Sequence, residues 1–252
     1  MKEYFDVLNQ YGEFRMNNQL LKIKQKIVLD NEYQSWMKKI SNVENEFVVS
    51  SNFNNKVALD HGIEHMDRVA NNVYKLLTEY NCSKNICILG YIAGLIHDIG
   101  MINGKRGHAE NGAEMSKIFL KKLDLVNTTD VTKIANAIKN HGNGGVNPDI
   151  ISAFLAISDK ADMCKSRSLG DLSPIQFIEN YTIKIKNNVL KINYIMTDLK
   201  GKEGLYIIPK SIDIPRALGS NLGLKVEFYI NGKYEKFRDK EKYKGEIYQR
   251  KE

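Results

Sequence analysis

The chain has 252 residues, of which 42% are hydrophobic, and it carries a net charge of +7 with a pI of about 9.1. That length suits one large or two modest domains, and the composition is that of an ordinary globular protein. The positive charge is explained equally well by an anionic partner, such as a nucleotide or a nucleic acid, and by a lysine-rich solvated surface.

Three features predict a cytoplasmic protein. The three cysteines are odd in number and form no Cys-x-x-Cys pair, which is typical of free thiols in a reducing compartment. Residues 1–6 lack the apolar centre of a signal peptide. The longest apolar run, residues 86–96, is too short to span a bilayer.

Residues 1–50 are predicted to be an N-terminal layer of amphipathic helices. Apolar residues recur at helical spacing over residues 20–28 and again over residues 33–40, with charged residues between them. We favour a layer packed on the core over an arm that binds a partner. The Asn-rich residues 50–55 are expected to be a loop.

The histidines are concentrated in one part of the chain. All five lie between residues 61 and 141, and each sits beside an apolar helical pattern. His97 and Asp98 follow directly on the apolar run, where an imidazole beside a charge is costly unless something binds both. Because imidazole and carboxylate are both ligands of first-row metals, we expect a metal site.

The other candidate ligands fall on further predicted helices. A helix over residues 60–77 would put His61 and His65 on one face, where the alternative is an ordinary polar face. His108 begins a helix, and His141 ends a helix over residues 128–140. Asp159 closes a helix that starts at Pro148, and Asp162 is a rival for the same role.

A loop before His108 carries the candidate substrate-binding residues. Lys105 and Arg106 lie between two glycines, and their charges suit phosphate oxygens near a helix start. The alternative is a solvated loop.

Residues 171–252 have a different composition. Residues 181–186 and 190–195 alternate strictly about Asn187-Asn188, which predicts a β-hairpin. Further strands are expected at residues 205–208, 225–230 and 233–237, with a short helix or loop at 212–222 and a charged tail from 238. We expect this segment to mediate dimerisation, to cover one mouth of the site, or only to support the fold.

The combined pattern resembles the HD-domain metal-dependent phosphohydrolases over residues 54–167. The motifs that carry the resemblance are "HMDRVA", "LIHDIG", "HAENGAE", "IKNHG" and "ISDKAD". The resemblance implies a mainly α fold, an HD-type helical bundle at residues 51–170, here followed by a small β-rich (α+β) C-terminal segment. It also implies two metals per chain, with Asp98 as the bridge. The implied ligands are His65, His97, Asp98, His108, His141 and Asp159, with His61 as a further candidate.

Departures from the cyclic-dinucleotide branch of the family disfavour that activity. Met101 stands where that branch often has lysine, Gly142 stands where it has a second histidine, and the Gly-Tyr-Pro signature is absent. His61 occupies the place of a common carboxylate. The symmetric dinucleoside tetraphosphate hydrolases match comparably in ligand set.

We therefore expect a metal-dependent phosphohydrolase that cleaves a phosphate ester or anhydride, with a nucleotide as the expected substrate. The mixed N/O ligand set suits Fe, Mn, Ni, Co or Zn, which would activate a hydroxide for attack on phosphorus. Asp98, Lys105 and Arg106 are the expected catalytic residues. The alternatives are an HD-type di-iron oxygenase and a non-catalytic, metal-holding sensor or interaction protein. We expect no membrane or nucleic-acid partner, and a homodimer is considered.

Overall fold

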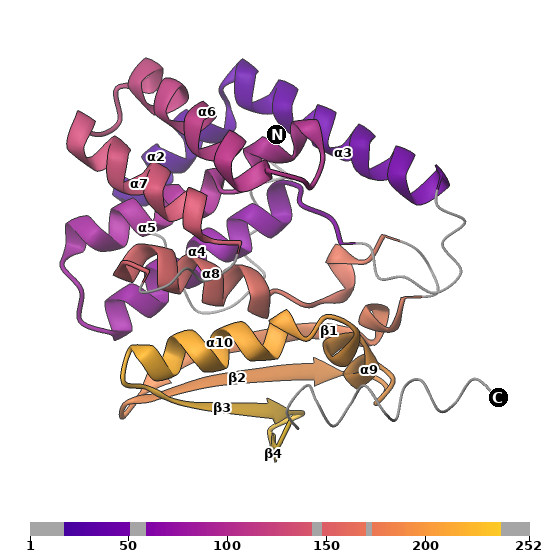
Figure 1. Ribbon diagram of the computed structural model, residues 1–252. Coiled ribbons are helices and arrows are strands. Elements are labelled where there is room, and N and C mark those ends of the chain that lie inside the picture. The colour runs from indigo at the N-terminus through magenta and orange to yellow at the C-terminus, as the bar shows by residue number, and fades with distance from the viewer. Residues whose placement is uncertain (1–17, 51–58, 143–147, 170–172, 238–252) are drawn as a thin grey trace.

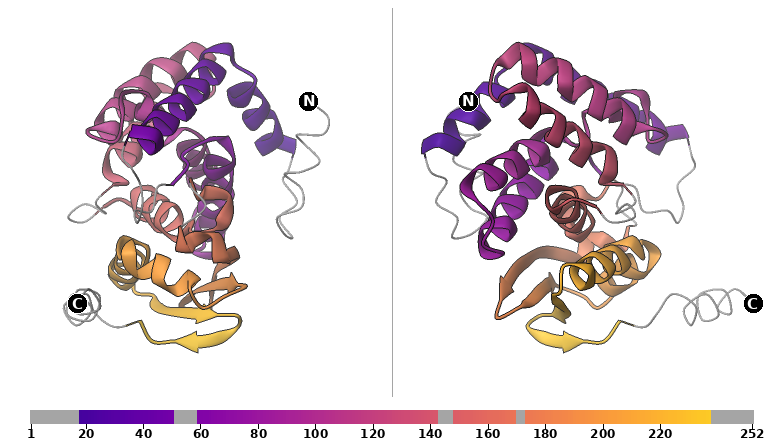
Figure 2. Two further views of the ribbon diagram at one scale, coloured as in Figure 1. Left: turned by 90° about the vertical axis from the view of Figure 1, so that its right-hand side faces the viewer. Right: turned by 60° about the vertical axis from the view of Figure 1, so that its left-hand side comes forward.

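The computed structural model describes residues 18–50, 59–142, 148–169 and 173–237. A bundle of helices occupies the N-terminal two thirds, and a four-stranded sheet with two helices lies at one end of it (Figures 1 and 2). The mainly α fold with a β-rich C-terminal segment is therefore confirmed. The expected loop at residues 50–55 and the tail from 238 lie outside the described residues, apart from Ser50, which ends a helix.

The helices of the bundle follow the predicted order. They are α2 (Asn18–Val28), α3 (Asn31–Ser50), α4 (Ile63–Glu79), α5 (Lys84–Ile96), α6 (His108–Leu123), α7 (Thr128–Asn140) and α8 (Ile150–Ala161), with the short 3-10 helices η1 (Ile99–Asn103), η2 (Lys165–Arg167) and η3 (Pro174–Phe177). Side-chain caps start several of them, among them Ser83 for α5, Asn127 for α7 and Asp149 for α8.

Helix α5 is the centre of the bundle. Every residue from Cys87 to Ile96 is buried, and α4 packs along its length. Gly94 permits that packing, because a Cβ there would lie 2.4 Å from the Cα of Ala70. The stretch Lys84–Asn103 is long and apolar enough to cross a membrane, but 83% of it is buried inside the protein, as in the core helix of a soluble protein.

The C-terminal sheet has the strand order β1-β2-β3-β4. Its strands and helices are β1 (Ile178–Lys186), β2 (Val189–Met196), α9 (Gly201–Ile207), α10 (Lys210–Asn221), β3 (Lys225–Ile230) and β4 (Lys233–Glu235). The predicted hairpin forms, with Asn187 and Asn188 both at positive φ in its turn. Strands β2 and β3 run parallel, joined by α9 and α10.

One strand prediction was wrong. Residues 205–208 belong mainly to α9, where Gly204 lies against Ile175 and Leu205 is buried. A short apolar run fits a helix or a strand equally well, and packing on η3 decides the outcome here. Residues 212–222, left open between helix and loop, are helical in α10.

Helix α10 lies between α8 and the sheet (Figure 1). The alternation along the strands therefore gives an inner face that contacts α10 and α4 and an outer face that points away from the bundle.

The two ends of the helical segment that holds the candidate ligands are joined. The backbone N–H of Asp60 donates to the carbonyl of Arg167 at 2.8 Å, and the Arg167 guanidinium donates back to the Asp60 carbonyl at 2.9 Å. Leu59 and Ser168 form an isolated β-bridge beside these bonds.

Candidate metal centre

Six side chains from five elements converge on one buried point. His65 lies on α4, His97 and Asp98 follow α5, His108 begins α6, His141 ends α7 and Asp159 lies near the end of α8. They form two groups of possible metal ligands that share Asp98: one of His65, His97, Asp98 and Asp159, and one of Asp98, His108 and His141. Within each group the ligand atoms all lie within 4.8 Å of one another.

The two oxygens of Asp98 divide the four imidazoles between them. Oδ2 lies 3.5 Å from His65 Nε2 and 3.1 Å from His97 Nε2. Oδ1 lies 3.4 Å from His108 Nε2 and 3.3 Å from His141 Nε2. Asp98 could therefore offer one oxygen to each of the two groups of possible ligands.

Each imidazole is oriented by its other nitrogen. Nδ1 of three histidines donates to the carbonyl three residues earlier, namely His97 to Gly94 at 2.9 Å, His108 to Lys105 at 2.8 Å and His141 to Ile138 at 2.5 Å. Nδ1 of His65 donates to Asp162 Oδ2 at 2.6 Å. Because carbonyls and carboxylates only accept, each Nδ1 carries its proton and each neutral ring directs an Nε2 lone pair inward.

The residues fit a bound cation. The Nε2 atoms of His65 and His97 are 3.2 Å apart, and so are those of His108 and His141. When the rings are neutral, the Nε2 lone pairs of each histidine pair face each other. Asp98 Oδ1 is buried without a hydrogen-bond partner among the described residues. A buried polar atom of this kind is costly unless it is paired, and divalent cations between the ligands would satisfy all of these atoms.

The electrostatics also call for positive charge at this point. Burial alone would raise the pKa of Asp98, but His97 and the other imidazoles hold it well below its usual range. Burial, and then the charge of Arg167, would lower the pKa of His65. The surrounding carboxylates, Asp159, Asp162 and Asp98, outweigh both and raise that pKa to about 9.

Asp162, the sequence rival of Asp159, lies outside both groups and supports His65 instead. Arg68 binds it with two hydrogen bonds, from Nε to Oδ1 at 2.9 Å and from Nη2 to Oδ2 at 3.1 Å. Burial would raise the pKa of Asp162, but Arg68 holds it well below its usual range. Arg68 is thus part of an interior ion pair, and it also lies 3.9 Å from the exposed Glu64 one turn earlier on α4.

His61 also lies outside both groups. Helix α4 begins only at Ile63, so His61 precedes the helix and does not share its face with His65 as predicted. Its Nδ1 lies 2.5 Å from Glu44 Oε1, and its ring centroid is 5.9 Å from that of His65. Asp60 accepts from the N–H of Gly62, which ends the extended segment before the helix. Glu44 was not singled out from the sequence, where it is one charge among many on an amphipathic helix.

The remaining predicted residues lie at the rim. Lys105 and Arg106 are exposed, and the Lys105 carbonyl holds the His108 ring. His108 is the one ligand in the two groups that is half-buried, whereas the other five are buried. Lys160 forms an ion pair with Asp159 Oδ2.

Comparison with known proteins gives one family model and a similar solved structure. The HD domain family model matches residues 62–164. A similar solved structure is that of a predicted HD superfamily hydrolase from an uncultured Thermotogales bacterium, with 20% identity, coverage of 52% of this chain and 68% of that chain, and a TM-score of 0.37. No curated protein matches.

The segment matched by the family model contains every ligand of both groups. An HD domain with such a His/Asp cluster supports a metal-dependent hydrolase. Residues 62–164 are therefore similar to an HD domain, and this segment holds both groups of possible ligands.

Proposed function

We propose that the protein is a phosphohydrolase that cleaves a phosphate ester or anhydride of a nucleotide. The observation that carries the proposal is the position of the Asp98 carboxylate, which offers one oxygen to each pair of imidazoles. Divalent transition metals, two per chain, would be held by His65, His97, Asp98 and Asp159 on one side and by Asp98, His108 and His141 on the other. Such metals supply Lewis acidity toward a phosphoryl oxygen and lower the pKa of water toward neutrality.

The protein's own residues would bind and orient the substrate. Because His108 is the half-buried ligand, the substrate reaches the centre past the loop that carries Lys105 and Arg106. The guanidinium of Arg106 suits two phosphate oxygens at once, and the ammonium of Lys105 adds a point charge. Arg68 and Asp162 keep the His65 ring in its tautomer and orientation.

A nucleotide panel tests the function. Metal-depleted protein is loaded separately with Mn, Fe, Co, Ni or Zn, and phosphate release is measured from mononucleotides, dinucleoside polyphosphates and phosphate esters. We expect release with at least one metal and a transition-metal content of about two per chain by elemental analysis. A loaded protein that releases no phosphate contradicts the proposal. Oxygen consumption with a di-iron EPR signal would then identify the oxygenase alternative. A metal-loaded protein with neither activity would favour the non-catalytic sensor.

The rim is tested on the best substrate from that panel. Lys105→Ala/Arg106→Ala should raise KM by about tenfold or more, because two charge-assisted contacts are lost, while metal content stays near that of the wild type. Lys117→Ala/Lys121→Ala, further along α6 from the site, is the matched control and should leave KM unchanged. Equal KM values in the two double variants would show that the loop is only solvated surface.

A further inference from the structure

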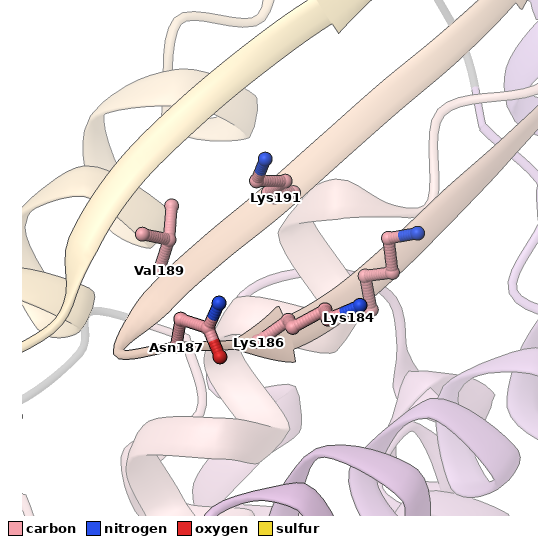
Figure 3. A pocket seen from close by; sticks show the side chains of 5 residues that line it. All are labelled: Lys184, Lys186, Asn187, Val189 and Lys191. Carbon is pink, nitrogen blue, oxygen red and sulfur yellow. The ribbon is translucent and has the colours of Figure 1, made fainter.

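The outer face of the C-terminal sheet is strongly basic near the β1–β2 hairpin. A cavity of about 380 Å³ opens there, lined by Lys184, Lys186, Asn187, Val189 and Lys191 (Figure 3). No carboxylate lines it. The cavity lies on the face that points away from the bundle and is separate from the metal centre.

The strand register arranges this face in rows. The first row is Lys186, Val189 and Lys225, and the second is Lys184, Lys191 and Glu227. The third row continues along the strands with Thr182, Asn193, Tyr229 and Tyr234. Two basic rows therefore lead directly into a row that ends in two tyrosines.

The charge of these rows is largely uncompensated. Glu227 is their only carboxylate, and it already pairs with Lys225 at 2.7 Å and Lys191 at 3.8 Å. Lys184 and Lys186 make no ion pair with any of the described residues. Lys184 lies directly opposite Lys191, and like charges in that position destabilise a sheet.

Protection of an exposed edge explains only part of this pattern. Strand β1 is an edge strand, and lysines there discourage pairing with another chain. Lys191, however, lies on β2, which is paired on both sides. Edge protection therefore does not account for Lys191, whose ion-pair partner Glu227 is shared with Lys225, whereas an anionic ligand would.

The tyrosines indicate which anion. Tyr234 is 62% exposed on the outer face, and its ring lies edge-on to Tyr229 at 5.9 Å between centroids. The Lys191 ammonium lies over Tyr229 at 5.5 Å from the ring centroid. A basic groove beside an exposed aromatic ring is the combination that binds single-stranded nucleic acid, with phosphates on the lysines and a base stacked on the ring.

We propose that the outer face of the sheet binds single-stranded nucleic acid. The strand's phosphates contact Lys184, Lys186 and Lys191, and a base stacks on Tyr234. This binding site is independent of the proposed hydrolase activity. It also goes against the expectation, drawn from the sequence, that nucleic acid is not a partner.

Fluorescence anisotropy with the metal-loaded full chain tests the proposal. The probes are labelled single strands of DNA and RNA of about 12 nucleotides, within the range that such surfaces cover. Lys184→Ala/Lys186→Ala/Lys191→Ala should weaken binding by about tenfold or more at about 50 mM salt. The slope of log affinity against log salt should become shallower by about 2, since each contact on a single strand contributes about 0.7. Tyr234→Ala should weaken binding by about fivefold or more through lost stacking.

The matched control is Lys38→Ala/Lys39→Ala/Lys121→Ala, which removes the same charge from exposed positions on α3 and α6 at the far end of the molecule (Figure 1). It should bind like the wild type, and all variants should keep wild-type metal content and melting temperature. If both triple variants lose oligonucleotide affinity equally, the loss comes from the lower net charge alone, and the proposal is overturned. Wild-type binding by Tyr234→Ala, with inorganic polyphosphate competing as well as the oligonucleotide, would show a plain anion surface and also overturn it.

Discussion

Asp98 is the residue on which both ligand groups depend. It is the only ligand that the two groups share, and each of its oxygens faces two imidazoles. Removing its charge leaves His108 and His141 without a carboxylate in their group, and leaves Asp159 as the one carboxylate in the other group. The surrounding helices do not depend on it, because α5 and α6 are held by apolar packing.

Asp98→Ala is therefore expected to abolish hydrolysis and to lower metal content from about two ions per chain to less than one, with the fold retained. Elemental analysis, an activity assay and circular dichroism measure the three outcomes. Asp98→Asn, which keeps the size without the charge, should behave in the same way. Wild-type turnover in either variant would place the catalytic centre elsewhere.

The buried carboxyl group of Glu44 has a raised pKa. Burial, and then the charge of Asp60, raises its pKa to about 8, from 4.5 for an ordinary glutamate. The unfolded chain releases this proton near pH 4.5 and the folded chain keeps it to about pH 8. The stability contributed by this group is therefore fully present below about pH 4.5 and is lost as the pH rises to about 8.

Glu44→Gln should remove this loss of stability with rising pH, because the amide keeps the contact with His61 and has no proton to release. The melting temperature of the variant, relative to the wild type in the same metal-loaded state, is expected to rise steadily between about pH 5 and pH 8. The exposed Glu64→Gln is the control and should show no such trend. A constant difference across this range would mean that Glu44 is ionised in the folded protein.

The candidate ligands that lie together could be named from the sequence, but the residues that hold them in place could not. The positions of His97 and His141 follow from where apolar helices end, which is a local signal. The partners of Asp162 and Glu44 are 94 and 17 residues away in the chain, and no spacing rule pairs them. His61 was misplaced because the helical pattern could not show that α4 starts at Ile63.

At the level of elements, the second ligand pair depends on how closely η1 packs on α6. A Cβ on Gly100 would lie 2.0 Å from the His108 carbonyl oxygen and 2.5 Å from the Gly112 nitrogen. Both are backbone atoms, so neither can move aside without displacing the helix. Gly100→Ala must therefore push η1 away from α6 and separate Asp98 from His108.

Gly100→Ala is expected to destabilise the fold by about 1–3 kcal/mol, the cost typical of overpacking, and to reduce metal content toward one ion per chain. Thermal denaturation and elemental analysis measure these effects. Gly142→Ala is the control near the site, since a Cβ there meets no atom of the described residues within 4 Å. Two ions retained by Gly100→Ala would show that η1 can shift without disturbing the centre.

The elements themselves were mostly predictable. The strict alternation of β1 and β2 and the caps of α7 and α8 are signals contained in short windows. The parallel pairing of β2 with β3 was not foreseen, because it depends on α9 and α10 crossing over, and α9 was read as a strand. The division into residues 1–50, 51–170 and 171–252 stays a prediction.

For the whole molecule, metal binding should account for much of the stability of the bundle. The ligands join α4 to α8, and without a cation their lone pairs and carboxylates are held together in a buried space. A ligand present at about a thousand times its Kd stabilises a protein by about 4 kcal/mol.

Removal of metal with a chelator should therefore lower the melting temperature by about 10 °C, since a chain of this size loses roughly 2–4 °C per kcal/mol. Calorimetry with and without the chelator measures the shift, and re-addition of the metal should restore it. Asp98→Ala should show almost no shift, because it holds little metal to lose. If the chelator does not change the melting temperature of the wild type, the metal makes no contribution to its stability.

The hydrogen bonds between Asp60 and Arg167 have a consequence for how this chain could be rearranged. They bring the two ends of the ligand-bearing segment to one point, so a polypeptide can leave and re-enter a host protein there without being stretched. Neighbouring ends of this kind are what insertion of a domain into another chain requires. A circular permutant with residues 60 and 167 joined by a short linker and new termini at the exposed Lys105–Arg106 loop keeps every ligand-bearing helix intact.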